Sequence, residues 1–201
     1  MAVITRRLTY DEYLALPESR QRYEIVDGEL IMVPSPTPRH QWISANLFRA
    51  LDRFIRAHHL GVLLYAPLDV VIQRSPLRVR QPDLLFLSAQ RSGITDGAQL
   101  QDVPLLPHPP DLVIEILSPA NPRRGMEEKL ADYRQVGVRE CWIVSPEAQT
   151  VEVMRLSPEV ELLDIFGTGM TVYSEVLEGF SLPVEYVFST HQGERGGVSD
   201  A

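Results

Sequence analysis

The chain is poor in features that would mark a secreted or membrane-bound protein. It has one cysteine, Cys141, so an internal disulfide is impossible, which fits a reducing compartment. We interpret Cys141 as a small buried hydrophobe on a strand. No apolar run approaches the roughly 20 residues of a membrane helix, and no apolar stretch of a signal peptide follows the first arginines. We therefore expect a cytoplasmic protein that does not contact a membrane.

An excess of positive charge is also missing. Nineteen Lys and Arg residues stand against 27 Asp and Glu residues, which gives a formal net charge of -8. This balance argues against indiscriminate binding of nucleic acid over the whole surface. A local basic cleft remains possible, and acidic residues gathered around a metal site would also make the total negative.

Length and composition predict one domain. The chain has 201 residues, of which 44% are hydrophobic and 23% charged, enough for a substantial core. It has no internal repeat and no shift in composition that would mark a second domain. We predict a single domain over residues 1–188 and a disordered tail over residues 189–201, which are polar and contain glycine.

The first third of the chain carries clear helix and hairpin signals. Thr9 and Glu12 have the spacing of a capping box, so a short helix follows and stops before Pro17. Residues 21–26 and 29–33 are strand candidates on either side of Asp27-Gly28, a strong hairpin turn signal.

The longest predicted helix starts at Thr37, the N-cap, with Pro38 in the first helical position. It should end near His58-His59, before Gly61, and we interpret this histidine pair as a solvated helix end. His40 falls on the apolar face of the helix. That face is formed by Ile43, Leu47, Ala50, Leu51 and Phe54, which recur at helical spacing.

Two longer strands follow and should pair with each other. Residues 63–72, interrupted near Pro67, and residues 79–87 flank a turn at 73–76, which predicts an antiparallel pair. Residues 88–110 lack periodicity and hold four prolines and two glycines. We expect them to form a surface loop, placed over the functional site.

A β-strand, a helix and a second strand come next. Residues 112–117 form a short apolar run bounded by prolines, and a helix over 126–136 stops at Gly137. The strand at 140–144 is of the type that follows a right-handed crossover, so the three elements predict a βαβ unit. Residues 150–156 and 160–166 predict a further antiparallel pair, and residues 178–188 should pack apolar side chains against the body.

Three ionisable residues converge on this unit. Asp83 follows a proline in one predicted strand, Glu115 interrupts the apolar run of the next, and Lys129 lies on the helix after it. Two carboxylates in one cleft repel when both are ionised, so the protein must raise a pKa or bind a cation. Mg²⁺ is held by one or two carboxylates together with substrate phosphate. A lysine beside such a site could activate water or stabilise charge on the phosphate.

The order of these motifs resembles a known family. The matching segments are residues 23–30, His40, and residues 81–84, 112–119, 129–133, 137–144 and 178–180. Together they are similar to a large bacterial family of restriction-endonuclease-like proteins in the PD-(D/E)XK phosphodiesterase superfamily. The resemblance covers residues 8–188. It implies an α/β fold with a restriction-endonuclease-like core, that is, a mixed β-sheet flanked by helices, with additional antiparallel strands.

The resemblance also implies chemistry. It suggests an endonuclease that depends on Mg²⁺ (or Mn²⁺) and hydrolyses nucleic acid, with DNA as the expected substrate and a homodimer as the expected assembly. Asp83 and Glu115 would bind the metal, and Glu24 would be an additional acid. The superfamily's usual lysine position is Leu117 here, so Lys129 is the matching catalytic candidate. Gly125 stands where many members carry an acid four residues before that lysine.

The acidic candidates and the lysine could also have purely structural roles. Asp83 could cap a strand or pair with Arg80, and Glu24 could pair with Arg22 or Arg20. Lys129 could be a solvated helix residue beside Glu128 or Asp132.

The substrate-binding candidates are His40, Tyr133, Arg123 and Arg124. His40 and Tyr133 could equally be core residues, and the two arginines a solvated pair. A second functional class stays open: a nuclease-fold binding module of a mobile-element or defence system, with weak or no catalysis.

Overall fold

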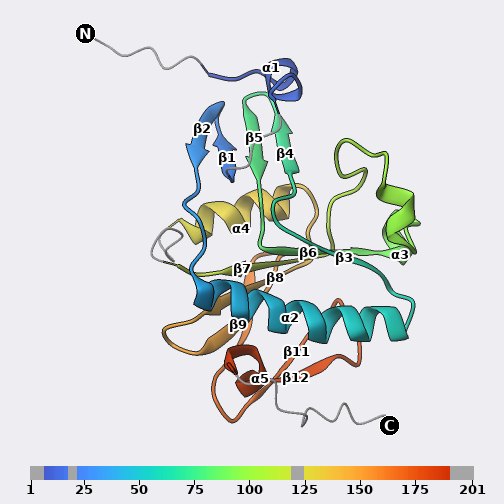
Figure 1. The fold of residues 1–201 in the computed structure, drawn as a ribbon, viewed down its shortest axis with the longest axis vertical. Coiled ribbons are helices and arrows are strands. Elements are labelled where there is room, and N and C mark those ends of the chain that lie inside the picture. Colours follow the sequence, from blue (N-terminus) through green and yellow to red (C-terminus); the bar gives the residue numbers. More distant parts are fainter. Residues whose placement is uncertain (1–6, 18–21, 119–124, 191–201) are drawn as a thin grey trace.

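A six-stranded mixed sheet lies at the centre of the computed structural model, which describes residues 7–17, 22–118 and 125–190 (Figure 1). The strand order is β10-β9-β8-β7-β6-β3. Strands β7 and β8 are parallel, and every other neighbouring pair is antiparallel. The strands are β3 (Gly61–Tyr65), β6 (Leu84–Ser88), β7 (Leu112–Ile116), β8 (Glu140–Ser145), β9 (Thr150–Arg155) and β10 (Glu161–Phe166).

The parallel pair confirms the predicted βαβ unit. Helix α4 (Met126–Gln135) connects β7 to β8 and ends before Gly137. Parallel neighbours need such a crossover, because a tight hairpin can join only antiparallel strands. The expected fold class, a mixed sheet flanked by helices with additional antiparallel strands, is therefore confirmed.

A second, four-stranded antiparallel sheet stands beside the large one, in the order β2-β1-β5-β4 (Figure 1). Its strands are β1 (Tyr23–Val26), β2 (Glu29–Met32), β4 (Val70–Arg74) and β5 (Leu77–Arg80). The β1–β2 hairpin turns at Asp27-Gly28, as predicted, with φ of 51° and 81°. A Cβ on Gly28 would lie 2.8 Å from the Cβ of Arg7, so both backbone conformation and space require glycine there.

The two long strands predicted over 63–72 and 79–87 are each divided between the two sheets. Their outer halves pair as β3 with β6, and their inner halves pair as β4 with β5. The chain changes sheet at Pro67 and at Pro82, where proline supplies no N–H for a sheet ladder. The antiparallel pairing and the interruption near Pro67 are confirmed, but the strand predicted over 79–87 is not continuous, because it breaks at residues 81–83. Asp83 consequently lies at the junction of the sheets, immediately before β6.

Residues 88–110 contain more structure than the expected loop. Helix α3 (Ala89–Ser92) is capped by Ser88, and a 3₁₀ turn, η1 (Gly97–Leu100), is capped by Asp96. The side chain of Asp96 accepts from the amide of Ala98, and the side chain of Gln99 accepts from the backbone amide of Asp96. Local capping side chains define these turns without any apolar periodicity.

Two helices cover opposite faces of the six-stranded sheet (Figure 1). Helix α2 (Pro38–Ala57) starts at the Thr37 cap as predicted and covers one face, while α4 covers the other. Because side chains alternate along a strand, Leu112, Ile114 and Ile116 pack in the core under α2, and Val113 packs with α4. This alternation directs Glu115 towards α4.

The C-terminal elements pack against α2. Strands β11 (Thr171–Tyr173) and β12 (Ser181–Pro183) form a hairpin sheet, and helix α5 (Val184–Phe188) follows. The side-chain amide of Asn46 donates to the carbonyls of Val187 at 3.2 Å and Ser189 at 2.8 Å. Defined packing thus reaches Ser189, and residues 191–201 of the predicted tail lie outside the described residues.

The remaining short helix, α1 (Tyr10–Leu14), has the capping box expected from Thr9 and Glu12. Cys141 is fully buried on β8, as expected of a structural cysteine. Within the described ranges, no helix is long and apolar enough to cross a membrane.

Candidate active site at the junction of the two sheets

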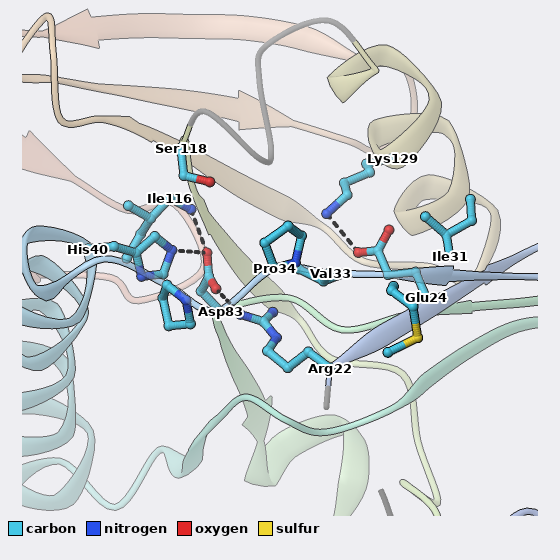
Figure 2. Close-up of a pocket in the computed structure, with 12 residues that line it drawn as sticks. Arg22, Glu24, Ile31, Val33, Pro34, His40, Asp83, Ile116, Ser118 and Lys129 are labelled. Atoms are coloured by element: carbon cyan, nitrogen blue, oxygen red, sulfur yellow. Dashed lines mark hydrogen bonds and ion pairs between the residues drawn. The ribbon is translucent and has the colours of Figure 1, made fainter. Parts of the chain in front are cut away.

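A cavity of about 110 Å³ opens where the two sheets meet the start of α2 and the first turns of α4 (Figure 2). Its polar lining consists of Arg22, Glu24, His40, Asp83, Ser118 and Lys129. Four of the residues singled out from the sequence (Glu24, His40, Asp83 and Lys129) therefore share one cavity. None of residues 88–110, all of which the structure describes, belongs to its lining, so the expectation that this segment covers the site is wrong.

Asp83 is a buried carboxylate surrounded by donors. Its Oδ1 accepts from Arg22 Nη1 at 2.9 Å, and its Oδ2 accepts from the amide of Ile116 at 2.8 Å. Nε2 of His40 lies 3.2 Å from Oδ2. Burial raises the pKa of Asp83, but His40, Arg22 and the Ile116 amide outweigh burial, so the pKa is lowered overall. Asp83 is thus ionised, and its cationic partner is Arg22, not the Arg80 that its place in the sequence suggested.

Glu115 lies behind the cavity wall, where Lys129 meets it. Nζ of Lys129 is 3.1 Å from Oε1 and 3.0 Å from Oε2 of Glu115. The Tyr133 hydroxyl donates to Oε1 in a short hydrogen bond. Burial raises the pKa of the Glu115 carboxyl, and the negative charges of Asp83 and Glu24 raise it further against the opposing effect of Lys129. Three acids are therefore close enough to disfavour one another's charge.

Lys129 also binds Glu24, which places its ammonium group between two carboxylates. Nζ lies 2.8 Å from Oε1 of Glu24. Burial lowers the pKa of Lys129, but Glu115 and Glu24 outweigh burial and raise it overall, so the ammonium stays charged. For Glu24, burial raises the pKa, while Lys129 and Arg80 more than reverse that shift and leave the pKa lowered. Lys129 is thus a buried, paired cation and not a solvated helix residue.

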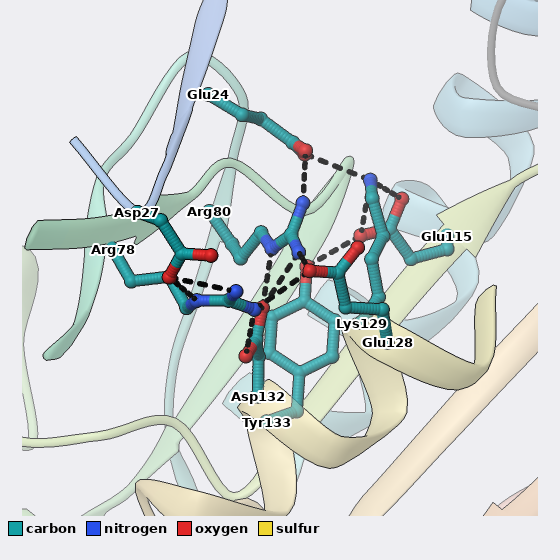
Figure 3. A network of polar contacts seen from close by, with 9 residues as sticks. All are labelled: Glu24, Asp27, Arg78, Arg80, Glu115, Glu128, Lys129, Asp132 and Tyr133. Carbon is teal, nitrogen blue, oxygen red and sulfur yellow. Dashed lines mark hydrogen bonds and ion pairs between the residues drawn. The ribbon is translucent and has the colours of Figure 1, made fainter. Parts of the chain in front are cut away.

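The polar network continues away from the cavity through two arginines of β5 (Figure 3). Arg80 is buried, and its guanidinium donates to Glu24 at 2.8 Å and to Asp132 at 2.7 Å. Arg78 lies 2.9 Å from Asp132 and 2.8 Å from Glu128. Glu24 therefore pairs with Arg80 and Lys129, not with Arg22. The network fixes α4, and with it Lys129, against the small sheet.

The sequence held signals for the residues that were missed. Leu77 and Val79 point into the core of the small sheet, so strand alternation places Arg78 and Arg80 together on its other face. Arg22 precedes Glu24 by two positions and so shares its face of the strand. These spacings identify one face of charged residues, but the partners of that face come from distant segments. Arg22 pairs with Asp83, immediately before β6, whereas Glu24 and Arg80 pair with residues of α4.

The remaining residues considered from the sequence lie outside the cavity lining or outside the described residues. Tyr133 is fully buried and lies behind Glu115, so the structure does not place it where a substrate would contact it. Arg123 and Arg124 lie outside the described residues. Leu117, at the superfamily's usual lysine position, is half-buried and packs against the hydrophobic core between α4 and the large sheet. The ammonium that reaches Glu115 comes from Lys129 instead.

The donor types suit a hard cation, although a complete protein-only site is not formed. Carboxylate oxygens of Asp83 and Glu24 line the cavity, and Glu115 lies directly behind Lys129. Among residues 7–17, 22–118 and 125–190, no three His, Cys, Asp or Glu side chains are grouped so that they could hold a metal ion. Mg²⁺ usually binds one or two carboxylates and completes its shell with water and substrate phosphate, so the residues fit a site that substrate completes.

Comparison with known proteins identifies the family and supports the fold. The Uma2 family model, described as "Putative restriction endonuclease", matches residues 10–185. The chain belongs to this family. Among solved structures, a "putative nuclease belonging to DUF820" from Anabaena variabilis ATCC 29413 superimposes with a TM-score of 0.73 at 21% sequence identity, covering 90% of this chain and 97% of the other. That likeness shows that the two chains share a fold. A search of curated proteins finds no match.

Proposed function

We propose that the cavity is the active site of a divalent-metal-dependent endonuclease that hydrolyses phosphodiester bonds of nucleic acid, with DNA as its substrate. One observation carries the proposal: the buried Lys129 ammonium is held between Glu24 and Glu115 at a cavity that also contains the ionised Asp83. Membership of the Uma2 family supports the nuclease class. Fold likeness alone would not fix the function.

Asp83 and Glu115 would hold Mg²⁺ or Mn²⁺, and Glu24 would support the site. The mutual influence of these acids on the pKa of Glu115 favours such an ion, because a cation relieves repulsion between carboxylates. When bound, the ion would polarise the phosphoryl oxygen and lower the pKa of an attacking water. For Glu115 to hold the ion, the Lys129 ammonium group would have to turn from Glu115 towards the cavity. Its contact with Glu24 would still pair the ammonium group with a carboxylate.

The chain's own side chains supply the other functions. Lys129 orients water or stabilises negative charge that develops on the phosphate. Arg80 holds Glu24 at 2.8 Å, and Glu24 holds Lys129 at 2.8 Å, so a buried chain of contacts positions the ammonium group. Arg22 lines the cavity and offers a guanidinium, which matches phosphate geometry. In this state Arg22 binds Asp83, and phosphate would compete for it.

The alternative is a binding module that has kept the fold and lost the reaction. A specific observation favours it: Asp83, Glu115 and Glu24 are each already within ion-pair distance of a cationic side chain. Gly125 adds to this case, since it replaces an acid that many relatives carry. In such a module the cavity charges are balanced without a metal ion, and the network serves stability.

A cleavage assay separates the two. The wild type is incubated with Mg²⁺ or Mn²⁺ and single-stranded, duplex and structured DNA, beside RNA of the same sequence. Glu115→Ala and Asp83→Asn test the site, and Glu147→Ala, an exposed acid on the β8–β9 turn, is the matched control. Circular dichroism confirms that each variant is folded.

Cleavage that needs the metal, persists in Glu147→Ala and disappears in a folded Asp83→Asn or Glu115→Ala supports the nuclease. No cleavage by the folded wild type under any of these conditions overturns it in favour of the module. The homodimer expected from the resemblance stays a prediction, which sedimentation velocity would measure.

A further inference from the structure

A second, larger cavity adjoins the candidate active site and has no role in the proposed reaction. Its volume is about 470 Å³, and it lies between α2 and the segment that follows β3. Arg22, His40 and Asp83 line both cavities. The second cavity therefore opens directly beside the acidic centre, by which we mean the carboxylates of Asp83, Glu24 and Glu115. We call the second cavity the α2 groove.

An exposed aromatic ring stands at the wall of the α2 groove. Tyr65, the last residue of β3, is 65% exposed. Its ring packs edge-to-face on Phe48 of α2, with centroids 5.4 Å apart and an interplanar angle of 85°. This contact limits the motion of the tyrosine ring while leaving most of it open to solvent. A supported and exposed ring is suited to stacking against a flat ligand.

The charge in the groove is positive, in contrast to the chain as a whole. Arg49 is exposed on α2 beside Phe48, and Nη1 donates to Asn46 Oδ1 at 3.2 Å. Among the residues that the structure describes, no carboxylate lies within ion-pair distance of Arg49. The Arg49 guanidinium also lies 6.0 Å from the centroid of the Trp42 ring. An arginine that is held by an amide oxygen and a ring, and not by a carboxylate, keeps its positive charge available for an anionic ligand, even in a chain of net charge -8.

Arginines next to a stacking aromatic are the elements with which proteins bind single-stranded nucleic acid. A duplex would offer its phosphates, but its bases stay stacked on one another and could not reach Tyr65. The volume also falls in the range of roughly 300–1,000 Å³ typical of small-ligand sites, which suits a single nucleotide.

We propose that the α2 groove binds one unpaired nucleotide beside the phosphodiester at the acidic centre. The base of this nucleotide stacks on Tyr65, and its phosphate forms an ion pair with Arg49. The preferred substrate is then single-stranded or locally unpaired nucleic acid. The placement beside the bond to be cut rests on the proposed nuclease function, whereas the binding itself does not.

Fluorescence anisotropy tests the proposal with the full chain in EDTA, so that binding is measured without cleavage. The probes are a fluorescein-labelled oligonucleotide of about ten nucleotides, within the range that such sites cover, and its duplex. The variants are Tyr65→Ala, Tyr65→Phe and Arg49→Ala. Tyr173→Ala is the matched control, because Tyr173 is 57% exposed and also packs edge-to-face on a phenylalanine, Phe166. Arg134→Ala, an exposed arginine on α4, controls for charge.

We expect the single strand to bind more tightly than the duplex. Tyr65→Ala should weaken single-strand binding about 5- to 150-fold, the usual effect of losing one stacked base, and Tyr65→Phe should retain it. Arg49→Ala should reduce the slope of log affinity against log salt by about 0.7, the effect of one phosphate contact on a single strand. Tyr173→Ala and Arg134→Ala should match the wild type.

Three results overturn the proposal: no binding of either probe, preference for the duplex, or equal effects of Tyr65→Ala and Tyr173→Ala. The nuclease proposal and the groove proposal can also be refuted independently of each other. A protein that binds through Tyr65 but cuts nothing refutes the nuclease and keeps the groove. A protein that cuts while the two tyrosine variants behave alike keeps the nuclease and refutes the groove.

Discussion

The ammonium group of Lys129 lies 3.1 Å and 3.0 Å from the two carboxylate oxygens of Glu115. The two residues are 14 positions apart, and the crossover from β7 into α4 brings them together. A carboxylate in the middle of an apolar strand would be costly if it were left uncompensated. The same contact keeps the ammonium group next to the cavity, from which it would turn towards a substrate phosphate in the proposed reaction.

Lys129→Met tests the structural part of this pair. Removing the ammonium leaves Glu24 and Glu115 buried without their shared cation, so the free energy of unfolding should fall by about 3–5 kcal/mol, as for other broken buried ion pairs. Urea unfolding near neutral pH measures the change. A loss under about 1 kcal/mol, typical of exposed pairs, would show that Lys129 is not held as the structure has it.

Tyr133→Phe removes one hydroxyl and little else. The hydroxyl donates to Glu115 inside the core, and a buried hydrogen bond to a charged group contributes about 1.5–3 kcal/mol. We expect a loss of unfolding free energy of that size in thermal or urea unfolding. Tyr173→Phe, at an exposed ring, is the control and should be neutral. Equal effects in the two variants would contradict the assigned role of Tyr133.

Asp83 should make stability depend on pH in the acidic range. The pKa of Asp83 in the fold is lowered from its ordinary value of 3.8. The unfolded chain therefore takes up the proton first as pH falls. The contribution is fully present above 3.8 and is lost as pH falls through the lower pKa of the folded state.

The advantage of the wild type over Asp83→Asn in urea unfolding should accordingly be larger at about pH 5 than at about pH 3. A gap that stays constant, or widens towards acid, would mean that the carboxylate is not stabilised in its charged form. Asp52→Asn, on the exposed pair of α2, serves as the reference for acid effects elsewhere in the chain.

Arg80→Met tests the network behind the cavity. Arg80 is 4% exposed and pairs with both Glu24 and Asp132. Its loss removes one of the two cations at each acid and leaves Lys129 with Glu24 and Arg78 with Asp132. We therefore expect a destabilisation of about 3 kcal/mol, the lower end of the range for a broken buried pair. Cleavage activity should also fall, because Glu24 would no longer be held against Lys129.

The exposed Arg56 pairs only with its helical neighbour Asp52 among the described residues, and Arg56→Ala should leave unfolding unchanged. If Arg80→Met lowered the free energy of unfolding no more than Arg56→Ala does, the network would not contribute to the stability of the fold.

Local patterns in the sequence predicted much of this fold. Caps, turn residues and apolar spacing indicated α1, α2, the β1–β2 hairpin and the βαβ unit, since each depends on residues close in the chain. The rarity of an acid inside an apolar strand identified Glu115, and the adjacent helix supplied Lys129. Asp83 was indicated by its place after a proline in the neighbouring predicted strand, and Glu24 needed the family resemblance in addition.

The pairings that complete the site were beyond local reasoning. Arg22 and Asp83 are 61 positions apart, and Arg80 and Glu24 are 56 apart. Which arginine meets which acid depends on how the small sheet leaves the large one at Pro67 and Pro82. The sequence marked the interruption near Pro67 but suggested one continuous strand through Pro82. It therefore did not show that both strands pass from one sheet to the other at the junction that brings these charges together.

The most direct measurement is a crystal structure with Mn²⁺ and an uncleaved oligonucleotide, in which anomalous scattering locates the ion. We predict an anomalous peak coordinated by carboxylate oxygens of Asp83 and Glu115 beside a substrate phosphate, with Lys129 turned towards that phosphate. An oligonucleotide bound elsewhere, or bound in the cavity without any metal peak on these two acids, would contradict the proposed active site.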